Sequence, residues 1–178
     1  EEIPKEINTL FIFPCKNEKI RDSIRYFLKE QSLSASQIKN LVIFGNATMG
    51  NSDSSESARM LPNLKVVDMS SFTGSLGAYA FYNCENLETV IRNSGLSRIP
   101  SQCFMNCRKL TTIMAGNKSP QIWNEIDLTN LTGGLAINTQ SFAGCIKLAT
   151  VKLPSASIGI AGSFRDCTSL STIYKNGD

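Results

Sequence analysis

One pattern of apolar and polar positions returns along the chain at nearly constant intervals. It reads F-x-x-C-x-x-L-x-T followed by Val or Ile, and it begins at Phe81, Phe104, Phe142 and Phe164. A unit this short cannot bury its own apolar face, so such units stack and bury it against one another. We therefore expect ladders of identical positions through one continuous core. The ladder residues are Phe81, Phe104, Phe142, Phe164, Cys84, Cys107, Cys145, Cys167, Leu87, Leu110, Leu148 and Leu170.

Two weaker units precede these four. The nearer one has Ala58, Leu61, Leu64 and Val67 in the four apolar positions, and the first fills three of them with Ile38, Leu41 and Phe44. The leucine position then falls at residues 41, 64, 87, 110, 148 and 170, which is a period of about 23 residues with one long interval. That interval lies between Ile113 and Phe142, and it predicts an insertion at about residues 117–134.

The stretch after each leucine predicts a short strand, because it alternates and is rich in β-branched residues. Six such strands would form a parallel sheet on the concave face, about 4.8 Å apart. Alternation leaves two columns of side chains pointing outward. The first column is Ile43, Val66, Thr89, Thr112, Thr150 and Thr172, and the second is Gly45, Asp68, Ile91, Met114, Lys152 and Tyr174.

The two ends of the stack differ. Residues 18–31 place Ile20, Ile24, Phe27 and Leu28 at helical spacing, with Asn17 as the expected N-cap. Together with an edge strand at residues 9–13, this helix is predicted to cap the first unit. The cap would cover residues 1–34 and the solenoid residues 35–178. The alternative is that the helix and strand form a separate appendage. No cap follows the last unit. Three explanations stay open there: the chain has been cut, its own polar tail shields the unit, or a second copy stacks on it.

The repeat resembles the BspA-like class of leucine-rich repeats, whose unit continues to a proline-ended tail. Lys152-Leu153-Pro154 and Ser97-Arg98-Ile99-Pro100 echo that tail imperfectly. The resemblance covers residues 35–176 and implies an α/β-type repeat solenoid, a right-handed leucine-rich-repeat stack of about six units. It also implies an adhesin-like, secreted or surface-attached bacterial protein that binds proteins of a host or a neighbouring cell.

The cysteines of the repeat are predicted to be small buried apolar residues, as free cysteine usually is. Parallel side chains in a ladder seldom aim at each other, which disfavours disulfides although neighbouring units lie within reach. A four-cysteine zinc site needs pairs that converge on one point, and these cysteines are spread along an axis. Cys103 occupies a small-residue position, and the role of Cys15 stays open. We expect no metal and no cofactor.

Composition argues against an enzyme and against a nucleic-acid partner. The chain has no histidine, which removes the commonest general base. Two carboxylate pairs can be imagined, Glu125 with Asp127 and Asp68 with Glu88, but solvated surface charge explains them. The net charge is only +3, with lysines and arginines scattered singly. No apolar run approaches the roughly 20 residues that a membrane-spanning helix needs.

Binding is predicted at the second outward column and at the insertion. Apolar groups at Ile91 and Met114, with Tyr174, would stand on a concave face, where such patches mark interfaces; Asp68 and Lys152 share the column. The insertion carries Trp123, a residue type enriched in interface hot spots, although Trp123 can also simply hold the insertion against the stack. The sequence thus favours a protein-binding module. An architectural or oligomerising module and a carbohydrate-binding module are the alternatives.

Overall fold

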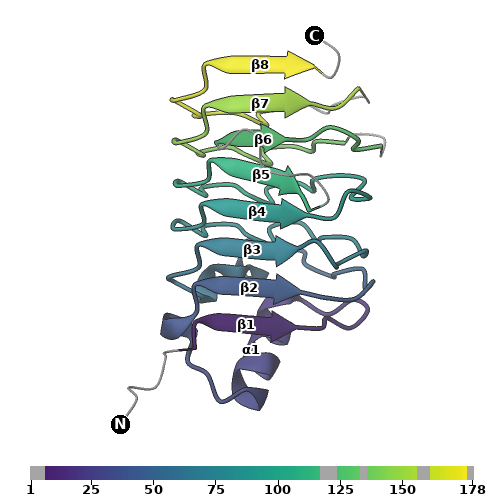
Figure 1. Ribbon diagram of the computed structural model, residues 1–178, viewed down its shortest axis with the longest axis vertical. Helices are drawn as coiled ribbons and strands as arrows, with labels where there is room; N and C mark the ends of the chain where they lie inside the picture. Colours follow the sequence, from purple (N-terminus) through teal and green to yellow (C-terminus); the bar gives the residue numbers. More distant parts are fainter. Residues whose placement is uncertain (1–6, 117–123, 133–135, 156–160, 176–178) are drawn as a thin grey trace.

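The chain folds as a stack of short parallel strands with a helix at its N-terminal end (Figure 1). A computed structural model describes residues 7–116, 124–132, 136–155 and 161–175. Within these residues one sheet contains eight strands in chain order. The strands are β1 Thr9–Ile12, β2 Asn40–Ile43, β3 Val66–Met69, β4 Thr89–Arg92, β5 Thr112–Ala115, β6 Glu125–Asp127, β7 Thr150–Leu153 and β8 Thr172–Lys175. The helices are α1 Ile20–Glu30 and the short 3₁₀ turns η1 Ala35–Gln37, η2 Ser54–Glu56 and η3 Ala58–Met60.

The predicted repeat stack is confirmed, and its register follows the motif. Val67, Val90 and Ile113 are consecutive partners in the sheet, and all three side chains are buried. The residues on either side of each point away from the core, as the two-residue period of a strand requires. We call the surface that they form the sheet face.

On the opposite side, which we call the turn side, each of the four units with the full motif forms a tight turn that carries the phenylalanine and the cysteine. The residue before the cysteine has a left-handed backbone, with φ of 57° at Asn83, 60° at Asn106, 75° at Gly144 and 59° at Asp166. Asparagine, aspartate and glycine tolerate this conformation best, which explains why these residue types hold the position. The turns bring the four phenylalanine rings into one stack, with centroids 5.4–5.5 Å apart.

The insertion contributes an eighth strand that the sequence does not predict. Ile126 of β6 pairs with Ile113 of β5 and with Val151 of β7. Ile126, Leu128 and Leu131 are buried, so this segment extends the core. On the turn side, by contrast, the ring of Phe104 stacks directly on that of Phe142. Over this stretch the stack therefore has one more strand on the sheet face than it has turns on the turn side.

Arg92 joins the inserted segment to the rest of the stack. It occupies a core-facing position of β4, next to the small side chain of Ala115, and is only 1% exposed. Its guanidinium donates to the carbonyl oxygens of Asp127 at 3.1 Å and Thr129 at 2.6 Å. The Asp127 carboxylate lies 4.0 Å away. Burial lowers the pKa of Arg92, and the Asp127 charge opposes that shift.

The predicted helix exists, but its N-cap was assigned wrongly. The N-cap of α1 is Lys19, and Asn17 has a left-handed backbone with φ of 61° and donates its N–H to Thr48. The side chain of Asn51, distant in sequence, accepts the N–H of Ile20 at 3.0 Å. Because a residue from another segment satisfies this helix end, local sequence could not identify it.

The frame of the first unit was also wrong. Leu41 pairs with Val67, so Leu41 fills the valine position and Ile38 the leucine position. Consequently Ile43 is buried, and Asn40 and Val42 point outward in its place. Gly45 lies beyond the strand and bridges to Phe72. The first unit lacks the phenylalanine and cysteine of the last four units, and its interval to the next unit is three residues longer.

Protonation of Glu56 is expected to weaken the attachment of α1. The buried Glu56 carboxylate lies 2.5 Å from Lys19 Nζ and accepts the backbone N–H of Ser52 at 2.5 Å. The hydrogen bond from Lys19 holds the pKa of Glu56 at about 2, against an ordinary 4.5. A pKa that folding lowers contributes stability above the unfolded value, and this contribution is lost as pH falls towards the folded value. Glu56→Gln should therefore unfold at a lower temperature at pH 7, with a flatter profile between about pH 5 and 2. Thermal unfolding followed by circular dichroism tests this, and parallel profiles for the two proteins would contradict it.

Candidate binding face

The sheet face carries two columns of side chains that point away from the core, although Thr112 and Glu125 among them are buried. The first runs through Thr9, Asn40, Val66, Thr89, Thr112, Glu125, Thr150 and Thr172. The second runs through Phe11, Val42, Asp68, Ile91, Met114, Asp127, Lys152 and Tyr174. The first column is mainly hydroxyl and amide, while the second mixes apolar, aromatic and charged groups. The two columns together define the candidate site.

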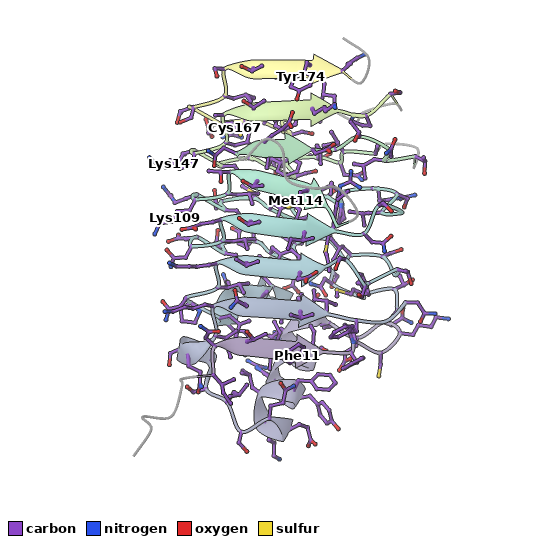
Figure 2. All side chains as sticks on the ribbon, viewed as in Figure 1. Phe11, Lys109, Met114, Lys147, Cys167 and Tyr174 are labelled. Carbon is purple, nitrogen blue, oxygen red and sulfur yellow. The ribbon has the colours of Figure 1, made fainter. Side chains whose placement is uncertain are left out.

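The structure brings most of the predicted binding residues together on this face. Ile91 and Met114 are partners on β4 and β5, and Asp68 is the partner of Ile91 on β3. Lys152 and Tyr174 are partners on β7 and β8, with the Lys152 ammonium 5.7 Å from the Tyr174 ring centre. Figure 2 shows Phe11, Met114 and Tyr174 spread along the stack on its strands. Trp123 lies outside the described residues.

Two aspartates of the second column turn the chain after their strands. Oδ1 of Asp68 accepts the N–H of Ser70 at 3.0 Å and its hydroxyl at 2.7 Å. Oδ1 of Asp127 accepts the N–H of Thr129 at 3.0 Å and its hydroxyl at 2.6 Å. Both carboxylates thus form local Asx turns, a structural role that aspartate commonly has.

An aromatic cluster at the N-terminal end of the sheet face was missed by the sequence reasoning. It consists of Phe11, Phe13, Phe44, Phe27 and Tyr26. Phe11, Phe13 and Tyr26 are 45%, 54% and 56% exposed. The ring of Phe44 stacks on those of Phe11 and Phe13, with ring centroids 6.2 Å from Phe11 and 4.9 Å from Phe13. The signal was present, since alternation from Leu10 places Phe11 and Phe13 outward.

The thiols of the repeat lie in the core rather than at the candidate site. Sγ of Cys107 donates to the carbonyl oxygen of Phe81 at 3.2 Å, and Sγ of Cys145 to that of Phe104 at 3.1 Å. Burial raises the pKa of Cys84 to about 12 and that of Cys167 to about 11. A thiol that stays protonated is a poor nucleophile and metal ligand. Within the described part of the chain, no group of cysteine, aspartate or glutamate side chains could hold a metal ion.

Comparison with protein families gives a match over most of the chain. The family described as BspA type leucine rich repeat region matches with 6 copies, over residues 25–132 and 123–177. The chain belongs to this family. No curated protein and no solved structure matches the chain.

As a member of this family, the chain is a leucine-rich-repeat module. Modules of this type are typically non-enzymatic scaffolds and commonly mediate protein interactions. Among the residues that the structure describes, no helix is both long and apolar enough to cross a membrane.

Proposed function

We propose that this chain is a non-enzymatic protein-binding module whose partner lies against the sheet face. The observation that carries the proposal is a set of partly exposed apolar side chains on that face. Phe11 and Val42 are neighbours on β1 and β2, and Ile91 and Met114 are neighbours on β4 and β5. Apolar surface that folding leaves uncovered tends to mark interfaces, and aromatic residues and methionine are enriched at interface centres.

The family supports the wider biological setting of the proposal. Relatives of this type are usually associated with bacterial surfaces. We therefore include an adhesin-like role, at the cell surface or outside the cell, in which the partner is a protein of a host or of a neighbouring cell. Trp123 and the insertion are proposed to border the same surface, and Lys152 and Tyr174 its far end.

Capture of a protein partner should depend on Met114. We expect Met114→Asp to reduce capture from extracellular-matrix and bacterial-surface extracts by about tenfold or more, because a charge at an apolar interface centre must be desolvated. Met105→Asp is the matched control, since Met105 is also partly exposed but lies in a turn opposite the sheet. Capture is measured by quantitative pull-down with immobilised chain. Equal losses in both variants, or none in either, would count against binding at the sheet face.

The aromatic cluster gives the carbohydrate-binding alternative little support, although it contains several rings. Sugars stack on open ring faces, but Phe11, Phe44 and Phe13 lie nearly parallel, at 20° and 15°, and cover one another's faces.

One observation favours the architectural alternative. Ile173 of β8 fills the position that is buried in the units below, yet it is 54% exposed. Association of two copies through this unit would cover Ile173. Light scattering that finds only monomers at high concentration would remove this alternative.

A further inference from the structure

The stack of units splits where the insertion enters. On the turn side, the unit of Phe104 contacts the unit of Phe142 directly, and Cys145 Sγ donates to the Phe104 carbonyl oxygen across that contact. On the sheet face, β6 separates β5 from β7. The two units therefore touch on the turn side and diverge towards the sheet face, where β6 lies between them.

A hollow of about 430 Å³ lies at this split. Its lining includes the hydroxyls of Thr89, Thr111 and Thr112 and the amide of Asn124. Lys109 and Lys147 also line it, and Figure 2 shows both at the edge where the strands begin. Each of these lining side chains carries a polar group, and two of them are lysines from adjacent turns.

The lysines replace a structural residue of the lower units. The position before the leucine of the motif holds Asn63 and Asn86 there, and their side-chain amides donate to carbonyl oxygens of the preceding unit, at 2.7 Å to Ser36 and 2.8 Å to Pro62. The same position holds Lys109 and Lys147 at the split. Both lysines are exposed, and like charges in adjacent turns repel each other. A bound anion would relieve that repulsion.

We propose that this hollow receives an acidic side chain of the protein partner. The proposal rests on the protein-binding function above and specifies part of its recognition. A carboxylate between Lys109 and Lys147 gains charge-assisted hydrogen bonds, and the side chains of Thr89 and Asn124 can donate the remaining ones. Glu88, which also lines the hollow, repels negative charge, so the two lysines can offset a single carboxylate better than a polyanion such as nucleic acid. None of the lining residues that the structure describes has an aromatic ring on which a sugar could stack.

Backbone-amide NMR titration tests the proposal. The probe is a short capped peptide with one central glutamate among glycines, and its glutamine counterpart is the matched control. We expect the glutamate peptide to shift the amide signals of Thr111, Thr112 and Asn124, to bind about tenfold more tightly than the glutamine peptide, and to weaken as salt is added. No shift at these amides, or equal binding of the two peptides, would overturn the proposal.

Two double variants separate a specific site from general attraction. Lys109→Gln with Lys147→Gln should abolish the preference for the glutamate peptide. Lys39→Gln with Lys65→Gln removes the same charge from exposed lysines of lower units and should retain the preference. Equal loss in both double variants, or tighter binding of a glucuronate oligosaccharide at the same amides, would refute an acidic side chain as the ligand.

Partner capture distinguishes this proposal from the one on which it rests. If Met114→Asp abolishes capture and the Lys109/Lys147 double variant does not weaken it, the hollow has no part in recognition but the sheet face is still the binding surface. If the glutamate peptide binds in the hollow but capture is indifferent to Met114→Asp, the proposed use of the sheet face fails instead.

Discussion

Replacing Arg92 with methionine is expected to lower the free energy of unfolding by about 3–5 kcal/mol. Arg92 is buried and donates to the carbonyl oxygens of Asp127 and Thr129. Methionine fills similar space but donates no hydrogen bond. The two carbonyl oxygens therefore lose the donor that Arg92 supplies, and the Asp127 carboxylate loses a nearby cation. Buried acceptors without a donor cost free energy even where packing is preserved.

The loss should be concentrated in the inserted segment. Urea unfolding measures the total change, and amide hydrogen exchange at Ile126 and Leu128 locates it. Arg108→Met is the control, because the exposed Arg108 lies 3.9 Å from the exposed Glu85, and a surface ion pair of this kind contributes about 0–1 kcal/mol. Unchanged exchange at β6 in the Arg92 variant would show that other contacts hold the insertion in place.

Arg92 also shows why part of the fold could not be predicted from sequence. Alternation from Val90 places Arg92 on the core side, but nothing local shows what accepts its hydrogen bonds, since the acceptors lie 35 and 37 residues further along the chain. The strand that it anchors has three residues and stands outside the repeat motif. Short strands of this kind form through tertiary contacts, which a local pattern does not contain.

The regular units were predictable because each carries several mutually consistent signals. Phe104, Cys107 and Leu110 fix the frame of one unit, and Asn106 supplies the left-handed residue that its turn needs. The first unit lacks such anchors, and its frame was misassigned by three residues.

The candidate site was predictable to the same extent, because alternation places Ile91, Met114, Lys152 and Tyr174 once the frame is known. The aromatic cluster was not recognised, since it combines β1, α1 and the end of β2, which are distant in sequence. The hollow at Lys109 and Lys147 was not foreseen either, because it depends on β6 dividing two units that remain in contact elsewhere.

The second large effect is expected at the centre of the phenylalanine stack. Phe104→Ala should lower the free energy of unfolding by about 3–5 kcal/mol, because it removes a fully buried aromatic side chain and leaves a cavity. It also removes two stacked ring contacts, 5.4 Å to Phe81 and 5.5 Å to Phe142. The stability of a repeat stack depends on contacts between neighbouring units, so a break here divides the stack.

Phe164→Ala is the matched comparison, because Phe164 fills the same position of the last unit. It is only partly buried, and its ring stacks on one neighbour, Phe142, at 5.5 Å. We expect its loss to be about half that of Phe104→Ala or less, with a single unfolding transition retained. Urea unfolding followed by circular dichroism measures both variants. If the two substitutions cost the same, neither the deeper burial of Phe104 nor its second ring contact would account for the stability of the stack.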